Sequence, residues 1–313
     1  MKKILFLILV IVCCIKVYSQ QQTTGSSPFE HVIVIGIDGM SSEGLMKAKT
    51  PYMDQLIEKG AFKYDARTIL PTVSSPNWSA MIHGAGPEIT GITSNDWEPD
   101  STFMKPVIAN KSGHFPSIFN LIREQMPSAE QGTIFHWDGF GRLLQKDVVN
   151  RYEHVATPTE SAQKFAEYIQ EKKPTFAFLQ LDHVDGAGHN FGHMTEGYLQ
   201  SIVNADSLVA IIVDAIKQAG IGENTFLMIV SDHGGINKGH GGESMEEITV
   251  PVIYCGKKIK KGYRIQQQVY MYDVAANIAF ALGLKVPYAW TGRPTKAAFT
   301  GFGEPENLNI GIQ

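Results

Sequence analysis

Residues 31–39 read HVIVIGIDG, a run of mostly β-branched residues that ends in an aspartate and a glycine. Strands that are buried on both faces of a parallel sheet have this composition. The carboxyl ends of such strands form the edge at which open α/β sheets bind their ligands. The run therefore predicts a central strand with the Asp38 side chain at a ligand-binding edge.

Similar buried runs recur along the chain and alternate with helical patterns. Strands are expected at 132–137, 175–182, 225–231 and 250–255, and helices at 51–60, 115–126, 158–173, 195–220 and 273–282, with a further helix beginning at Ser74-Ser75. This alternation predicts an α/β fold, a three-layer sandwich with a mostly parallel central sheet and helices on both faces. Residues 95–113 are expected to form a loop over the site, and 142–154 a small insertion.

The bulk composition indicates one globular domain. The chain has 313 residues, 43% of them hydrophobic, and no internal repeat or linker, so a single domain is expected over 29–313. The net charge is −4 without a basic block, so no binding of duplex nucleic acid is expected.

The N-terminus predicts export. Residues 1–19 combine Lys2 and Lys3, a short apolar run and a small residue, Ser19, as in a secretory signal peptide, and 20–28 reads as a polar tether. The mature chain is then expected to be periplasmic or extracellular, without a transmembrane segment. Lipidation of Cys13 or Cys14 is an alternative that the preceding residues do not favour.

Potential metal ligands follow three of the predicted strands. They are Asp38, then Asp185 with His189, and then Asp232, His233 and His240. Each is a weak signal alone, since a strand-terminal aspartate often caps a helix and 185–189 (DGAGH) could be a simple turn. Together they make a complete set for two metal ions, and mixed carboxylate and imidazole ligation favours Zn²⁺.

A fourth segment adds a possible nucleophile. Residues 70–95 read LPTVSSPNWSAMIHGAGPEITGITSN, with two serines at the start of a predicted helix. A serine there is often only an N-cap. Near metal ions, the same position would place a hydroxyl beside unpaired backbone N–H groups and the positive end of the helix dipole.

These residues, taken in order, resemble the alkaline phosphatase superfamily and, within it, the nucleotide pyrophosphatase/phosphodiesterase family. The resemblance covers roughly residues 32–294. It rests on Asp38-Gly39, Pro71-Thr72-Val73-Ser74-Ser75-Pro76-Asn77, Gly91-Ile92 through Asn95, Asp185-x-x-Gly-His189, Ser231-Asp232-His233-Gly234 and Gly239-His240-Gly241.

The resemblance implies a role for each matching residue. Asp185, His189 and His240 would hold one metal ion, and Asp38, Asp232, His233 and the nucleophile the other. The nucleophile falls on Ser74, with Ser75 as the alternative, and Asn95 would donate to a phosphoryl oxygen. The implied reaction is hydrolysis of a phosphate diester or pyrophosphate through a phosphoseryl intermediate.

Two departures bear on the substrate, which is expected to be a small phosphate ester and possibly a nucleotide. Many diesterases of this family have threonine as nucleophile and histidine after the Pro-Asn pair, where this chain has Ser74 and Trp78. A phosphomonoesterase on the same site is therefore an alternative, and a non-catalytic binding protein is a remote one. Trp78 and Trp97 could stack on a leaving group or pack inside the fold.

Overall fold

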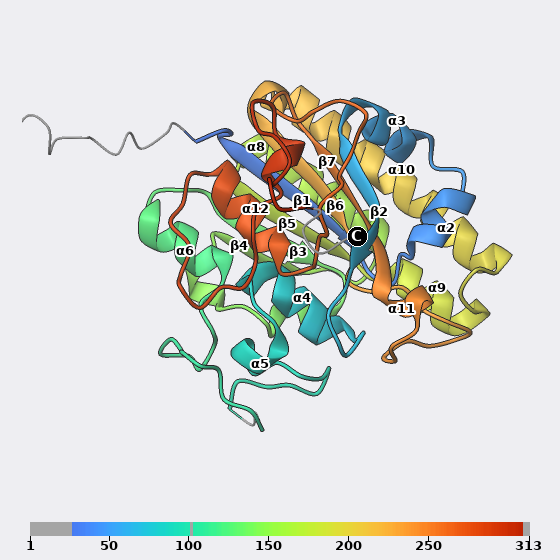
Figure 1. The fold of residues 1–313 in the computed structure, drawn as a ribbon, viewed down its shortest axis with the longest axis horizontal. Helices are drawn as coiled ribbons and strands as arrows, with labels where there is room; N and C mark the ends of the chain where they lie inside the picture. Colours follow the sequence, from blue (N-terminus) through green and yellow to red (C-terminus); the bar gives the residue numbers. More distant parts are fainter. Residues whose placement is uncertain (1–26, 101–102, 309–313) are drawn as a thin grey trace, which may run out of the picture.

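The computed structural model describes residues 27–100 and 103–308 (Figure 1). The predicted signal peptide, both lipidation candidates and most of the predicted tether lie outside these residues. The described part contains one eight-stranded sheet in the order β4-β3-β5-β1-β6-β7-β2-β8. The strands are β1 (His31–Ile37), β2 (Ala61–Arg67), β3 (Gln131–Phe135), β4 (Arg151–His154), β5 (Phe176–Leu181), β6 (Thr225–Val230), β7 (Thr249–Cys255) and β8 (Tyr263–Arg264).

The sheet is mostly parallel, as predicted. Only β7 runs against its neighbours, β6 and β2, and all other pairs of described strands are parallel. Alternate residues of β1 enter two separate hydrophobic clusters, with Val32 and Val34 in one and Ile33 and Ile35 in the other. A strand covered on both faces is what the continuous apolar run predicts.

Helices cover both faces of the sheet and complete the three layers. They are α2 (Ser42–Lys47), α3 (Pro51–Lys59), α4 (Ser74–His83), α5 (Pro87–Thr90), α6 (Ile118–Gln125), α7 (Asp138–Gly141), α8 (Pro158–Lys172), α9 (His183–Phe191), α10 (Glu196–Gln218), α11 (Met245–Ile248) and α12 (Asp273–Ala281). Figure 1 shows α4, α6 and α12 together on one side of the sheet and α2, α3, α9 and α10 on the other.

The long helix α10 lies along one face of the sheet. Its apolar stripe, from Tyr198 to Ile216, is buried there. Among the described residues it is the one helix with the length and hydropathy to cross a membrane, and half of its most apolar window is buried inside the fold. A buried core helix meets the same criteria, so this finding does not identify a membrane span.

The structure adds three strands to those predicted and excludes the simple-turn alternative for residues 185–189. The region expected to be an insertion contributes the edge strand β4, and β2 and β8 extend the opposite side of the sheet. Residues 185–189 are helical rather than a simple turn, because they lie within α9. This helix places Asp185 and His189 one turn apart on the same face.

Candidate active site

Three neighbouring strands deliver the predicted ligands to one place. Asp38 follows β1, Asp232 follows β6, and Asp185 lies at the start of α9 directly after β5. Since β5, β1 and β6 are adjacent and parallel, their carboxyl ends meet at the same edge. The structure thus brings together residues that lie almost 200 positions apart in the chain.

The six ligand candidates form one continuous cluster. His189 Nε2 lies 3.1 Å from Asp185 Oδ2, and His240 Nε2 lies 3.7 Å from Asp185 Oδ1. His233 Nε2 lies 3.4 Å from Asp38 Oδ1 and 3.2 Å from Asp232 Oδ2. The cluster has two halves, one made of Asp185, His189 and His240 and the other of Asp38, Asp232 and His233. The rings of His233 and His240 stack with centroids 3.7 Å apart and so connect the two halves.

Two groups within this cluster have the geometry to hold a metal ion. One is Asp185 with His189 and His240, and the other is Asp38 with Asp185 and His233; within each group the ligand atoms lie within 4.8 Å of one another. Asp185 belongs to both groups, whereas the sequence prediction assigns it to one. The carboxylate of Asp185 therefore lies between the two halves of the cluster.

The three histidines present the same ring nitrogen to the cluster. Nδ1 lies 2.9 Å from the Lys238 carbonyl in His189, 2.8 Å from the Gly234 carbonyl in His233, and 2.8 Å from the Thr72 carbonyl in His240. A carbonyl oxygen can only accept, so Nδ1 carries the proton and the Nε2 lone pair faces the cluster. This tautomer is the one that ligates metal ions.

The carboxylates also fit metal ions. Asp38 Oδ1, Asp185 Oδ1 and Asp232 Oδ2 are buried oxygens without a hydrogen-bond partner among the described residues. An unpaired buried carboxylate oxygen is unfavourable unless a cation compensates it. These three oxygens and the three Nε2 atoms form a donor set of the type that holds Zn²⁺ and similar ions.

Burial controls the ionisation of this cluster. Desolvation, followed by repulsion from neighbouring aspartates, raises the pKa of Asp38 well above its usual value, and desolvation does the same for Asp232. Desolvation lowers the pKa of His233 well below its usual range. Without bound cations, burial thus favours the neutral forms of these aspartates and of this histidine. Positive charge from cations would stabilise the ionised carboxylates.

Ser74 lies at the buried N-terminus of α4. Its Oγ is 3.2 Å from His233 Nε2, inside the cluster. The Ser75 hydroxyl is buried without a hydrogen-bond partner among the described residues, and the Ser75 backbone N–H donates to Asn95 Oδ1 at 2.8 Å. Of the two serines, the geometry brings the Ser74 hydroxyl to the ligand cluster. Because the Asn95 amide oxygen is engaged as an acceptor, its Nδ2 is the atom that can donate to a ligand.

The two tryptophans lie inside the fold. The Trp78 ring is fully buried between Phe140 and Phe178, and its Nε1 donates to Asp38 Oδ2 at 2.9 Å. Trp97 is 5% exposed and packs edge-on against His114. A ring buried to this extent leaves no face on which a nucleobase could stack, so the burial of both residues supports the packing alternative.

Two further residues, which the sequence patterns do not identify as part of the site, also contact it. Gln180 Nε2 donates to Asp38 Oδ2 at 3.1 Å. Thr72 binds the His240 loop, because its hydroxyl accepts from Gly241 N at 2.9 Å and donates to the Gly242 carbonyl at 2.8 Å. For Gln180, the sequence feature that could have indicated a role in the site is its polar side chain within an apolar strand. For Thr72, the only such feature is its position two residues before Ser74.

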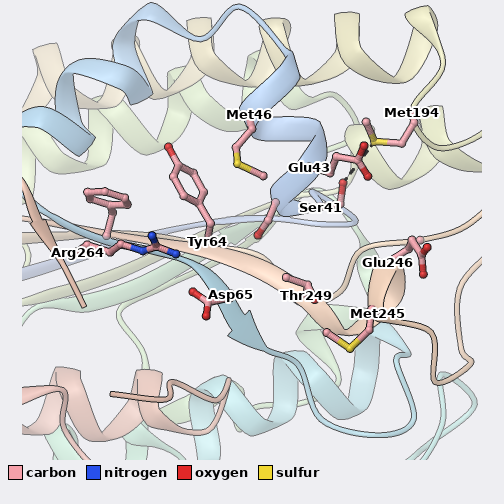
Figure 2. Close-up of a pocket in the computed structure, with 13 residues that line it drawn as sticks. Ser41, Glu43, Met46, Tyr64, Asp65, Met194, Met245, Glu246, Thr249 and Arg264 are labelled. Carbon is pink, nitrogen blue, oxygen red and sulfur yellow. Dashed lines mark hydrogen bonds between the residues drawn. The ribbon is translucent and has the colours of Figure 1, made fainter. Parts of the chain in front are cut away.

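Two cavities lie near the cluster. One, of about 480 Å³, is lined by residues of the loop predicted over the site, among them Glu98, and by residues around Arg142. Arg142 donates to the Asn95 carbonyl at 2.8 Å and pairs with Glu98, so this cavity adjoins the Asn95 segment. The other, of about 690 Å³, lies between the start of α2 and β2, where Met46, Tyr64 and Met245 line it (Figure 2). None of the predicted site residues lines either cavity.

A comparison with known families agrees with the geometry. Residues 32–248 match the model of the type I phosphodiesterase / nucleotide pyrophosphatase family. The chain belongs to this family. Human ectonucleotide pyrophosphatase/phosphodiesterase family member 1 is 22% identical over 214 residues, which are 64% of this chain and 23% of that protein. This chain thus spans about a quarter of the length of that relative.

Another branch is similar to a comparable degree. The catalytic subunit of human GPI ethanolamine phosphate transferase 2 is 26% identical over 285 residues, which are 86% of this chain and 28% of the transferase. Among solved structures, an inactive form of murine ectonucleotide pyrophosphatase/phosphodiesterase 5 in complex with AMP superposes with a TM-score of 0.68 at 15% identity, covering 82% of this chain and 96% of that one. This structural likeness shows the fold, which is alkaline phosphatase-like as predicted.

Proposed function

We propose that the chain is an exported hydrolase of phosphate diesters or pyrophosphates, with Ser74 as its nucleophile. The observation that carries the proposal is the position of the Ser74 hydroxyl, which lies 3.2 Å from His233 Nε2 within a cluster of three aspartates and three histidines. Membership of the family supports phosphoryl hydrolysis or transfer in general. The finer assignment to diesters rests on the charges of the site.

Those charges match a substrate with one negative charge at phosphorus. Asp38, Asp185 and Asp232 would hold the ions with His189, His233 and His240. Two bound divalent ions would stabilise the attacking and leaving oxygens of an in-line displacement. Three carboxylates against two such ions leave one net positive charge while Ser74 is protonated and none once its hydroxyl is ionised, so the site carries at most one positive charge. In the described part of the chain, no lysine or arginine side chain forms a hydrogen bond or ion pair with Ser74 or the six ligands, so a second phosphate charge has no side-chain cation there.

The protein groups divide the displacement between them. Ser74 Oγ loses its proton and forms the new bond to phosphorus while the bond to the leaving oxygen breaks, and the leaving oxygen takes up a proton. The products are a serine that carries the phosphoryl group with its remaining ester, and an alcohol or nucleotide. Asn95 Nδ2 and the Ser74 backbone N–H, at the N-terminus of α4, donate to the non-bridging oxygens. Water then releases the phosphoryl group and restores the serine.

The substrate is proposed to be a nucleotide or a comparable small phosphate ester. The cavity of about 480 Å³ beside Asn95 has the size of a small-molecule site. The related fold of murine family member 5 has been solved with AMP, which supports a nucleotide as a first candidate. The predicted signal peptide supports an extracytoplasmic location, where such substrates would be met.

The proposal is tested by comparing two substrates of the same leaving group. Zinc-loaded protein should turn over bis(4-nitrophenyl) phosphate faster than 4-nitrophenyl phosphate, in terms of kcat/KM. The Ser74→Ala variant serves as the blank for contaminating phosphatase. A large preference for the monoester would favour the phosphomonoesterase alternative and contradict the proposal.

A metal analysis separates both enzymes from a non-catalytic binding protein. After zinc loading and removal of free ions, the protein should retain about two ions per chain. Retention of less than one, together with no turnover of either substrate, would support a binding protein that has only kept the fold.

A further inference from the structure

Asp38 differs from Asp232 and from the ligand histidines in what holds it. The ligand histidines are held by backbone carbonyls, and Asp232 Oδ1 accepts from the backbone N–H groups of Gly39 and His233. Asp38 Oδ2 instead accepts from two side chains, the Trp78 indole at 2.9 Å and the Gln180 amide at 3.1 Å. Its other oxygen, Oδ1, is left without a hydrogen bond and faces His233.

The indole that binds Asp38 is held in place from all sides. Trp78 is fully buried on α4, and its ring meets Phe140 and Phe178 edge to face. Its six-membered ring rests on Gly36 of β1, where an added Cβ would come within 2.5 Å of Cζ3 and 2.6 Å of Cη2. The glycine inside the run HVIVIGI therefore makes room for this tryptophan, two residues before the ligand that the tryptophan binds.

We infer that Trp78 is a positioning residue for metal binding: its indole N–H fixes Asp38 Oδ2 and thereby presents Oδ1 to the ion shared with Asp232 and His233. The inference rests on the proposed function in that it assumes a metal ion in this half of the cluster. Partners that orient a ligand commonly change metal affinity by about 10- to 100-fold when they are removed. The position is also one at which this chain departs from the histidine of many diesterases in the family.

The test measures zinc affinity by calorimetry rather than activity. Trp78→Phe keeps the ring packing and removes the donor, so it should weaken zinc binding in the Asp38 half by about 10- to 100-fold. Trp290→Phe is the matched control, because Trp290 is also buried and its Nε1 has no hydrogen-bond partner among the described residues. This control should bind zinc as the wild type does.

Two backgrounds assign the loss to one half of the cluster. In His189→Ala, which weakens the Asp185 half, adding Trp78→Phe should lower the affinity of the remaining site. In Asp232→Asn, which weakens the Asp38 half, adding Trp78→Phe should change little. An equal loss in both backgrounds would show a general packing effect and overturn the inference.

A second variant tests the same contact without removing any donor. Gly36→Ala should displace the indole from Asp38 and weaken zinc binding similarly, and the double variant with Trp78→Phe should be no weaker than Trp78→Phe alone. Unchanged zinc affinity in a folded Trp78→Phe or Gly36→Ala protein would overturn the inference. Failure of the wild type to bind zinc would instead contradict the proposed function.

Discussion

The two halves of the ligand cluster differ most in their exposure to solvent. Asp38, Asp232 and His233 are fully buried beneath the N-terminus of α4, where the ends of β1 and β6 meet. In the other half the His189 side chain is 47% exposed, and its partners lie on α9 and on the loop that carries His240. In this second half the side chains of His240 and Asp185 are only 9% and 11% exposed. One half is thus enclosed by strand ends and a helix, and the other opens to solvent at His189.

This difference suggests that the two halves serve different steps of the proposed reaction. The enclosed half contains the Ser74 hydroxyl and excludes bulk water, which strengthens the electrostatic interactions of a nucleophile. The open half can admit the water that releases the phosphoryl group. Asp185, which belongs to both metal-binding groups, connects the two.

Replacing the proposed nucleophile should have the largest effect. Ser74→Ala should lower kcat by at least about 10³-fold, because a nucleophile that acts as part of a unit cannot be replaced by its neighbours. Zinc content, measured by atomic absorption, should remain near that of the wild type. Ser75→Ala is the matched control and should stay active; the reverse pattern would transfer the nucleophile to Ser75.

Ligand substitutions should distinguish the two halves. His233→Ala removes a buried ligand beside Ser74 and should abolish tight binding of one ion, with a loss in activity of more than about 100-fold. His189→Ala removes a half-exposed ligand, whose place water can take, and should cost less in both measurements. Equal losses for the two variants would break the distinction between the halves.

Removing the contact between Thr72 and the loop that carries His240 should have an intermediate effect on activity. Thr72→Val removes the hydroxyl that binds Gly241 and Gly242 and should lower kcat about tenfold, since small displacements of a ligand loop reduce catalysis. Thr72→Ser keeps the hydroxyl and should restore most of the rate. If the kcat of Thr72→Val equalled that of the wild type, this contact would not be needed to position the His240 loop.

The sequence predicted the ligand edge better than the residues that support it. The apolar runs before Asp38 and Asp232 were long enough to identify buried strands, and the parallel order follows from the alternation with helices. The strand β2 was not predicted, because its sequence AFKYDAR includes Lys63, which is buried, and Asp65, with which Lys63 forms an ion pair. Such a pattern does not resemble an apolar strand.

The helical position of the Asp185 segment and the roles of Trp78 and Gln180 required the structure. The glycines in DGAGH favour a turn by local propensity, but in the fold this segment lies within α9, which packs against α10. The contacts of Trp78 and Gln180 with Asp38 join residues 40 and 142 positions apart. Contacts of that kind depend on packing between strands and helices, which no local pattern contains.

The smallest expected effect concerns folding stability at the far end of α4. Burial lowers the pKa of His83 from 6.5 to about 3, so the folded protein keeps this histidine neutral while the unfolded chain takes up a proton. Stability of metal-free protein should therefore fall as pH drops from about 6.5 towards 3, with a His83 contribution of about 2 kcal/mol by pH 5. In His83→Gln, urea unfolding should show a smaller loss between pH 7.5 and pH 5. If the free energy of unfolding depended on pH identically in both proteins, the lowered pKa of His83 would be contradicted.

The most direct test of the two-halved site is anomalous diffraction from zinc-loaded crystals. The account predicts two zinc peaks in each chain, one among Asp38, Asp232, His233 and Ser74 and the other among Asp185, His189 and His240. A single peak, or peaks that lie away from these residues, would contradict it.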